Sequence, residues 1–204
     1  MSAQSIKREP RTQRSRREDA EKALLDAAEQ LITEQGLEST SLAQIGDLAG
    51  YSRGLVSHHF GSKSALFARL SERMQREFAG SIKVERHMNG LTTLLHVVDQ
   101  YFRMKHARGT RGGTFFLIWA NAINSGDSAG FGATESRARD EIMSIVETGV
   151  RDGSIRSTIE PRSIALTVIA IMRGIALQAL VDPQHVDLLT QRESVTEFLR
   201  DALT

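Results

Sequence analysis

The sequence predicts an all-α protein whose N-terminal part contains a helix-turn-helix. Along most of the 204 residues, apolar side chains recur at steps of three and four, which is the spacing of amphipathic helices. No run of alternating apolar and polar residues indicates a strand. Two short helical segments, Leu42 to Ala49 and Ser52 to Phe60, are joined by a turn that contains Gly50. Two short helices at this separation are typical of a helix-turn-helix.

The first expected helix precedes this motif. Its apolar residues keep helical spacing as far as Gly36, where a glycine suits the end of a helix. They are Ala23, Leu24, Ala27, Ala28, Leu31 and Ile32.

The turn of the motif is expected at Gly50, because glycine adopts the left-handed conformation that such a turn needs. Ser52 follows in the position of an N-cap for the second helix. At about 100° per residue, Val56 and Phe60 project to the same side of that helix. They would pack against apolar residues of the motif's first helix, namely Leu42, Ile45 and Leu48.

The opposite side of this second helix suits DNA. Its outward residues are Gly54, Leu55 and His58, flanked by Arg53, Ser57 and His59. The arginine, serine and histidine side chains offer hydrogen bonds to phosphates or base edges, and Leu55 suits a thymine methyl. Gly54 costs about 1 kcal/mol relative to alanine inside a helix, and close approach by another molecule would explain it. The alternative from spacing alone is a solvated face in some other all-helical protein.

The segment from Thr40 to Leu66 resembles the DNA-binding domain of TetR-family (tetracycline-repressor-family) transcriptional regulators. In that family a threonine precedes a pattern that reads roughly I-A-x-x-A-G-V-S-x-G-x-L-Y-x-H-F-x-S-K-x-x-L. The corresponding residues here are Thr40, Ile45, Gly46, Ala49, Gly50, Tyr51, Ser52, Gly54, Val56, Ser57, His59, Phe60, Ser62, Lys63 and Leu66. The chain departs from the pattern at Gly46 (usually alanine), at Tyr51 (usually valine) and at Ser57, where the family often has an aromatic residue that touches DNA.

The resemblance implies two domains: a DNA-binding domain over residues 18–77 and a helical effector-binding and dimerisation domain over residues 78–204. It also implies a homodimer that binds a near-palindromic double-stranded DNA operator. We expect the two subunits to pair through helices near 133–152 and 161–181 as a four-helix bundle. The second helix of the motif would enter the major groove, and Ser41 and Lys63 are candidate phosphate contacts. The candidate DNA-binding residues are Ser41, Tyr51, Ser52, Arg53, Gly54, Leu55, Ser57, His58, His59 and Lys63.

Residues 1–17 form a basic segment without apolar periodicity, so we expect a disordered arm in the free protein. Six cations stand against one acid, Glu9: Lys7, Arg8, Arg11, Arg14, Arg16 and Arg17. The arm either contacts phosphates or the minor groove beside the motif or serves as a solubilising tail. The sequence leaves both open.

The rest of the chain is predicted to be helical. A connecting helix is expected through Phe67, Leu70, Met74 and Phe78, and a further helix from Leu91 to Arg108. Glycine-bearing loops over 109–113 and 125–132 would flank a short helix from Thr114 to Asn124, which is apolar almost all round and therefore buried or beside a cavity. Three more helices are expected, over about 133–151, from Pro161 at the N1 position to Val181, and over about 192–203.

The C-terminal domain is expected to hold a small-molecule effector whose identity the sequence does not give. Apolar candidates for its cavity are Phe102, Phe115, Phe116, Trp119, Ile123, Met143 and Met172, and polar candidates are His106, Asn121, Arg173 and Gln178. Arg173 is a lone charge in an apolar helix and needs a partner. The candidates are a carboxylate across a dimer, a helix end or an anionic ligand.

Composition and motifs argue against several other classes of protein. The absence of cysteine excludes disulfides and thiolate metal sites and suits a reducing cytoplasm. The N-terminus lacks the apolar core of a signal peptide. Ser163 to Val181 is long enough to span a membrane, but Arg173 near its middle favours a helix buried between subunits or against a ligand cavity. We therefore expect no membrane association.

Enzyme signatures are also missing. His58 and His59 are adjacent, so their side chains diverge on a helix and cannot chelate one metal, and no nucleophile elbow or phosphate loop occurs. We expect no catalytic residue, metal or cofactor. The sequence thus indicates a cytoplasmic transcriptional regulator, most simply a repressor released from DNA by a mainly apolar effector. An activator or a ligand-independent regulator of the same fold is the alternative, and a helical enzyme or membrane-associated protein is a remote one.

Overall fold

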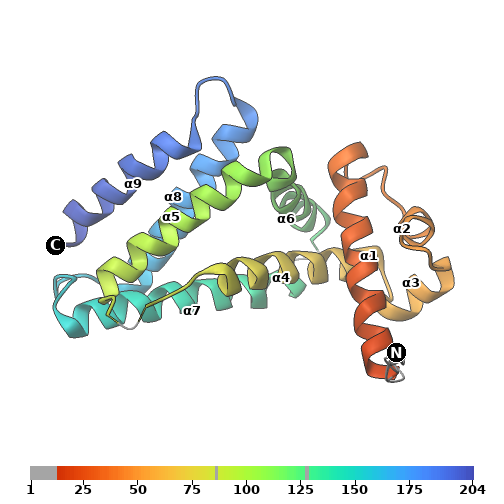
Figure 1. Cartoon of the computed structure of the whole chain (residues 1–204), viewed down its shortest axis with the longest axis horizontal. Helices are drawn as coiled ribbons and strands as arrows, with labels where there is room; N and C mark the ends of the chain where they lie inside the picture. Colours follow the sequence, from red (N-terminus) through yellow and green to blue (C-terminus); the bar gives the residue numbers. More distant parts are fainter. Residues whose placement is uncertain (1–12, 86, 127–128) are drawn as a thin grey trace, which may run out of the picture. The chain divides into compact units, whose positions relative to one another are not determined.

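The computed structural model describes residues 13–85, 87–126 and 129–204, and within these ranges the chain is helical and contains no strand (Figure 1). The all-α prediction is confirmed. The helices are α1 Gln13–Gln35, α2 Leu42–Ala49, α3 Arg53–Phe60, α4 Lys63–Ser81, α5 Gly90–Arg108, the 3-10 helix η1 Gly109–Gly113, α6 Thr114–Ser125, α7 Ala129–Asp152, α8 Pro161–Val181 and α9 Leu188–Leu203.

The chain forms two compact units that divide between Leu66 and Phe67, inside α4. The sequence placed the domain boundary later in the same helix, after residue 77. Because α4 runs through both units, its first turn belongs to the N-terminal unit and the remainder to the C-terminal unit.

The N-terminal unit is built on contacts of α2 with α1 and with α3. Its fully buried side chains come from the apolar positions that the periodicity identified. They are Leu24, Ala28 and Ile32 of α1, Ile45 of α2, Val56 of α3 and Leu66 of α4. Burying side chains of this size stabilises the unit by roughly 1.5–3 kcal/mol each for the larger ones. Thr40, between α1 and α2, is also buried, and its hydroxyl donates to the carbonyl of Gly36 at 2.8 Å.

The bounds of α2 and α3 follow from local chemistry. Ser41 and Gln44 form a capping box at the start of α2. At its end Gly50 adopts φ 77°, and the N–H groups of Gly50 and Tyr51 donate to the carbonyls of Asp47 and Gly46, which is the Schellman arrangement. The hydroxyl of Ser52 then accepts the N–H of Leu55 at 3.3 Å as the N-cap of α3. The predicted turn and N-cap are confirmed.

Position 46, where the TetR-family pattern usually has alanine, is glycine in this chain, and the geometry of the turn explains why. A Cβ atom at this position would lie 2.6 Å from the carbonyl oxygen of Tyr51 and 3.2 Å from the Cγ2 atom of Val56. The turn backbone therefore approaches α2 more closely than an alanine would allow without a shift.

The basic arm differs partly from expectation. Residues 1–12 lie outside the described residues, but Gln13 to Arg17 are helical and form the beginning of α1. An ion pair between Arg14 and Glu18, with Nε 2.9 Å from Oε1, supports this first turn. Such i, i+4 pairs stabilise a helix by a few tenths of a kcal/mol. The spacing of apolar residues does not reveal them.

In the C-terminal unit, α5 packs against α7, α8 and α9 (Figure 1). Leu94, Val98 and Phe102 of α5 are fully buried, and Val146 of α7 and Val168 of α8 are equally buried. The approach of α5 to α7 depends on two glycines. A Cβ atom on Gly90 would lie 2.1 Å from the backbone nitrogen of Gly149, so only glycine fits this crossing.

The start of α5 is capped by its own chain and by the end of α7. Asn89 accepts the N–H of Thr92 at 2.8 Å, and the carboxylate of Asp152 accepts the N–H of Gly90 at 2.8 Å. Hydrogen bonds to the Ser154 hydroxyl and to backbone N–H groups of Ser154 and Gly90 hold the pKa of Asp152 below its usual value. This carboxylate therefore ties α5 to α7.

One expected loop and two expected helix starts in the C-terminal unit are wrong. Residues 109–113 form η1 rather than a loop. The loop expected over 125–132 is shorter, because α7 begins at Ala129 and buries the side chains of Phe131 and Thr134. Helix α9 begins at Leu188 rather than near 192, because Asp187 accepts the N–H groups of Leu189 and Thr190 as an N-cap.

Helix α8 begins as predicted, with Pro161 at the first helical position and Glu160 accepting the N–H groups of Arg162 and Ser163. By length and composition it could cross a membrane, and a third of its most apolar window is buried inside the C-terminal unit. It packs against α7, α5 and α9. These contacts make α8 a structural helix of a folded domain.

Candidate DNA-binding surface and ligand cavity

The exposed face of α3 carries the polar residues expected there. Arg53, Gly54 and His58 are exposed, while Leu55, Ser57 and His59 are half-buried. Val56 is buried and holds α3 to the core of the unit. A Cβ atom on Gly54 would have only the Ser52 hydroxyl within 4 Å, at 3.8 Å. No contact with the described residues therefore requires glycine at this exposed position.

The other candidates for DNA contact lie near helix starts. Ser41 and Ser52 are exposed, and both hydroxyls already act as N-caps. Tyr51 is half-buried in the turn. Lys63 is half-buried at the start of α4, and its ammonium donates to the carbonyl of Glu38 at 3.3 Å.

His59 differs electrostatically from an isolated histidine. Its burial lowers the pKa below the usual value, and the positive charge of Arg17 on α1 lowers it further. Its ring lies 6.4 Å from that of His58, centroid to centroid. His59 is therefore neutral near pH 7, and its imidazole can both donate and accept hydrogen bonds.

The C-terminal unit contains a cavity of about 140 Å³. Residues of α4, α5, α7 and α8 form its walls, together with residues of η1 and α6. The apolar lining consists of Met74, Phe78, Ala79, Ile82, Val97, Met104, Phe115, Ala138, Ile142, Ile145, Ile169 and Met172. The polar and charged lining consists of Gln75, Tyr101, Lys105, Arg108, Arg111, Glu141 and Arg173, and Gly112 completes it.

Lys105 is the buried cation of this cavity. Its ammonium donates to the carbonyl of Gly112 at 2.9 Å and lies 4.9 Å from the ring centroid of Phe116. Two further rings, those of Tyr101 and Phe115, are within 5.7 Å. The pKa of Lys105 is lowered to about 8, mainly by burial and to a smaller extent by the positive charges of Arg108 and Arg173.

Arg173 has a partner, as expected, but it is a carboxylate of the same chain and not one across a dimer, a helix end or an anionic ligand. Its guanidinium forms a bidentate ion pair with Glu135 of α7, in which Nη2 lies 3.1 Å from Oε1. Gln75 of α4 donates to the same Oε1 at 3.0 Å. The guanidinium also lies 5.1 Å from the Phe115 ring centroid and 5.9 Å from that of Trp119.

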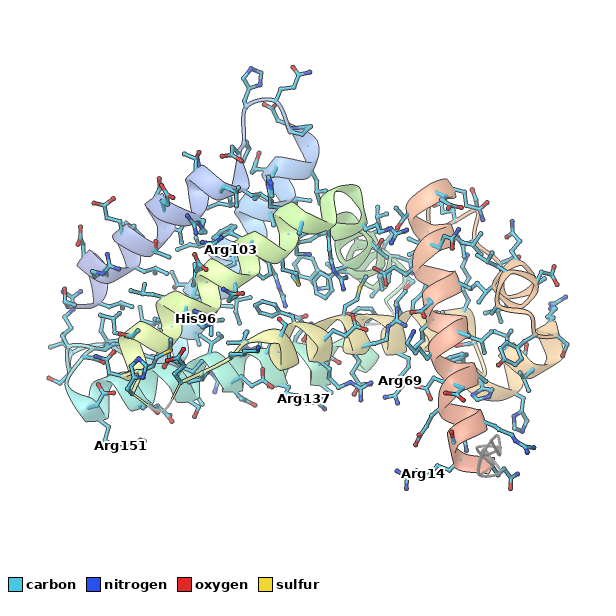
Figure 2. All side chains as sticks on the ribbon, viewed as in Figure 1. Arg14, Arg69, His96, Arg103, Arg137 and Arg151 are labelled. Atoms are coloured by element: carbon cyan, nitrogen blue, oxygen red, sulfur yellow. The ribbon has the colours of Figure 1, made fainter. Side chains whose placement is uncertain are left out.

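Further polar contacts join α4 to α7 beside the cavity. Arg69 of α4 and Arg137 of α7 are labelled in Figure 2, and their guanidinium groups lie 2.7 Å and 3.5 Å from the carboxylate of Glu72. Glu72 is thus shared between its own helix and α7, as Glu135 is shared between α4 and α8.

The sequence identified part of the cavity lining. Of its candidates, Phe115, Met172 and Arg173 line the cavity. The others do not: Phe102 and Phe116 are buried elsewhere in the core, Trp119, Asn121 and Met143 are half-buried, and His106, Ile123 and Gln178 are exposed. Reasoning from the sequence missed Lys105 and Tyr101, which lie one helical turn apart on α5.

The described residues contain no group of three or more side chains suited to hold a metal.

Family models match both units. Residues 24–70 match the model of bacterial regulatory proteins, tetR family. Residues 91–204, more than half of the chain, match the C-terminal domain of the BetI-type transcriptional repressor. The chain belongs to the TetR family.

Similar proteins agree with this assignment. HTH-type transcriptional regulator BetI of Cronobacter sakazakii is 24% identical over 184 residues, which cover 88% of this chain and 89% of that relative. SmeT, the repressor of the Stenotrophomonas maltophilia multidrug efflux pump SmeDEF, has the same fold, with a TM-score of 0.73 and 24% identity over 91% of this chain and 92% of SmeT. FadR, a fatty acid degradation regulator of Bacillus halodurans, gives a TM-score of 0.75 at 16% identity, covering 88% of this chain and 93% of FadR.

This TetR-family protein is a DNA-binding transcriptional repressor that responds to a ligand.

Proposed function

We propose that this repressor is a cytoplasmic homodimer that binds a near-palindromic double-stranded DNA operator through α3 and leaves it when a small, mainly apolar effector fills the cavity. The observation that carries the DNA-binding role is the face of α3. Arg53, Gly54 and His58 are exposed on a capped helix whose opposite side, at Val56, is buried. A helix held in this way can offer its outer face to the major groove.

Arg53 and His58 are the side chains that we assign to base edges, because both are exposed and carry hydrogen-bond donors. Ser41, Ser52 and Lys63 are assigned to phosphates, since they stand at helix starts where backbone N–H groups favour anions. Tyr51, Leu55, Ser57 and His59 flank them as secondary contacts.

The dimer is supported by an exposed apolar stripe on α8. Leu166, Leu177 and Val181 are 55%, 44% and 75% exposed, and the small residues Ala170 and Gly174 lie exposed between them. Phe198 on the neighbouring helix α9 is 59% exposed. The sequence assigned the dimer contact to residues near 133–152 and 161–181. Among the described side chains of α7, however, no large apolar residue is exposed, so we assign the contact to α8 and α9.

Helix α4 is our candidate for the connection between effector and DNA. Its residues 63–66 belong to the N-terminal unit, and Met74 and Phe78 line the cavity of the C-terminal unit. An effector that moves these side chains would bias the position of one continuous helix. Such a ligand shifts the equilibrium only by its differential affinity for the two states. SmeT, which has a similar fold, has been solved as a complex with triclosan.

The proposal is tested with an operator selected from a random DNA pool and binding measured by fluorescence anisotropy. Arg53→Ala and His58→Ala should each weaken operator binding by about 1–3 kcal/mol and relax specificity at one position. Lys63→Ala should weaken binding to all DNA sequences alike, and it should make the affinity depend less steeply on salt concentration. Arg151→Ala, at an exposed site near the end of α7 (Figure 2), is the matched control and should change nothing. Unchanged affinity in both α3 variants, with the fold intact, would refute the assignment.

A further inference from the structure

Lys105 is a buried positive charge without a counter-ion among the residues that the structure describes. The residue is 9% exposed, and its ammonium makes one hydrogen bond to oxygen, to Gly112. Within the described part of the chain, no carboxylate lies at ion-pair distance from it. An ammonium has three donors, and burying a charge without an opposite charge is unfavourable.

The other cations of the cavity lining are in a different situation. Arg173 is paired with Glu135 and Arg108 with Glu77, and Arg111 is exposed to solvent. Glu141 is the one carboxylate among the described residues of the lining, and it is exposed. The inner part of the cavity therefore has an excess of positive charge, centred on Lys105.

Tyr101 adds a hydrogen-bond donor beside this charge. It lies one helical turn before Lys105, lines the same cavity, and its ring centroid is 5.6 Å from the Lys105 ammonium. Its hydroxyl has no hydrogen-bond partner among the described residues, and burial raises its pKa, so it stays protonated at any ordinary pH. An ammonium and a neutral hydroxyl on one helix face suit a carboxylate group.

The size and walls of the cavity limit the rest of the ligand. A volume of about 140 Å³ is close to that of engineered apolar cavities that bind benzene, roughly 150 Å³. The walls include the rings of Phe78 and Phe115 and the flexible thioethers of Met74 and Met172. Aromatic rings and methionine sulfur both make favourable contacts with an aromatic guest.

We propose that the cavity selects a small lipophilic carboxylate, about the size of a substituted benzoate, whose negative charge meets the ammonium of Lys105 and the hydroxyl of Tyr101. This inference deepens the proposed function and rests on the cavity being the effector site. The sequence suggested Arg173 as the receptor of an anionic group, but its guanidinium is occupied by Glu135. A cationic ligand of the same shape is disfavoured, because it would bring a second positive charge to Lys105.

Three ligands of one shape and different charge test the proposal on the unmodified protein. They are 4-ethylbenzoate, 4-ethylbenzamide and 4-ethylbenzamidine, which carry charges of about −1, 0 and +1 near pH 7. Isothermal titration calorimetry should give the benzoate an affinity at least about tenfold higher than the amide, with no measurable binding of the amidine. An amide or amidine that binds as tightly as the benzoate, or a benzoate that does not bind, would overturn the proposal.

Two substitutions locate the charge contact. Lys105→Met should lower benzoate affinity by about 10- to 100-fold and leave the amide unchanged, since it removes a charge-assisted hydrogen bond of a typical size. Tyr101→Phe should lower benzoate affinity by a smaller factor, about 3- to 10-fold. Lys83→Met is the control, because Lys83 is exposed and lies outside the cavity lining. Equal loss for benzoate and amide would indicate a general packing defect and contradict the assignment of the charge.

Operator release, measured separately, distinguishes this inference from the proposed function. If the benzoate binds with the expected dependence on charge but leaves the operator complex intact, the chemistry of the cavity stands and its role as effector site fails. If the protein binds its operator and is released by neutral or cationic compounds alone, the repressor function stands and the carboxylate assignment fails.

Discussion

Arg173 of α8 and Glu135 of α7 form an ion pair whose two side chains are each 16% exposed, with Nη2 3.1 Å from Oε1. Gln75 of α4 donates to the same carboxylate oxygen. One carboxylate thus accepts hydrogen bonds from side chains of two other helices at the wall of the cavity. The pair explains how an apolar helix tolerates an arginine, because a charge that is paired and hydrogen-bonded can be buried.

Glu135→Gln should destabilise the protein, because it leaves the Arg173 guanidinium largely buried without a carboxylate. We expect a loss of about 1–3 kcal/mol in the free energy of unfolding, measured by urea denaturation. Glu147→Gln is the matched control, since Glu147 is exposed on the same helix, and its effect should stay within about 0.5 kcal/mol.

The double variant Glu135→Gln with Arg173→Met tests whether the lost stability of Glu135→Gln comes from the unpaired charge of Arg173. It should be more stable than Glu135→Gln alone, because it no longer holds an unpaired buried charge. Additive effects of the two substitutions would show that Arg173 and Glu135 do not interact energetically.

The helix-turn-helix could be predicted from the sequence because its determinants are local. Gly50 and Ser52 act on the residues next to them, through a left-handed turn and an N-cap. Val56 follows from helical periodicity within a few residues. The start of α9 is also local, and Asp187 could have indicated it as an N-cap.

The cavity could not be predicted in the same way, because its walls come from helices far apart in the sequence. How far along α6 the cavity wall extends is decided by packing, so Phe115 in the first turn lines the cavity while Trp119, one turn later, does not. A signal for Lys105 was nevertheless present. Leu94, Val98 and Tyr101 form a buried stripe on α5, and Lys105 stands where that stripe calls for an apolar residue.

Lys105→Met should stabilise the protein at neutral pH. Burial holds the pKa of Lys105 at about 8, below its usual 10.5, so the folded state carries the full cost of a buried ammonium below pH 8. That cost corresponds to about 3 kcal/mol. Loss of the hydrogen bond to Gly112 offsets about 1 kcal/mol of it, which leaves a net gain of roughly 2 kcal/mol at pH 7.

The gain should shrink as the pH rises from 8 to 10.5. In this window the unfolded chain holds the lysine proton more tightly than the folded chain does, so the stability of the unmodified protein rises relative to that of the variant. Urea denaturation of both proteins at pH 7 and pH 10 measures the difference. A difference that does not change with pH would mean that Lys105 titrates as an exposed lysine does.

Gly54→Ala should strengthen α3 and weaken DNA binding. The added methyl group meets only the Ser52 hydroxyl, at 3.8 Å, and alanine favours a helix over glycine by about 1 kcal/mol. If the α3 backbone approaches DNA at this point, the same methyl group should lower operator affinity while the melting temperature rises. Anisotropy and thermal unfolding of one preparation test both. Unchanged operator affinity would show that DNA does not come close to residue 54.

Leu177→Glu should dissociate the homodimer and reduce operator affinity together. Leu177 lies in the exposed apolar stripe of α8, and a carboxylate there would be buried without a partner in a dimer. Light scattering at micromolar concentration should give about twice the 22.6 kDa chain mass for the unmodified protein and a mass near that of one chain for the variant. Phe198→Glu on α9 should act in the same direction.

Ser144→Glu, at an exposed position of α7, distinguishes this interface from the pairing of α7 and α8 that the sequence suggested. A charge at position 144 should not affect a dimer built on α8 and α9, so the mass of this variant should remain that of two chains. A dimer built on α7 would be weakened by Ser144→Glu and left intact by Phe198→Glu. Because a palindromic operator needs two recognition helices at a fixed spacing, the variant that becomes monomeric should also be the one that loses the operator.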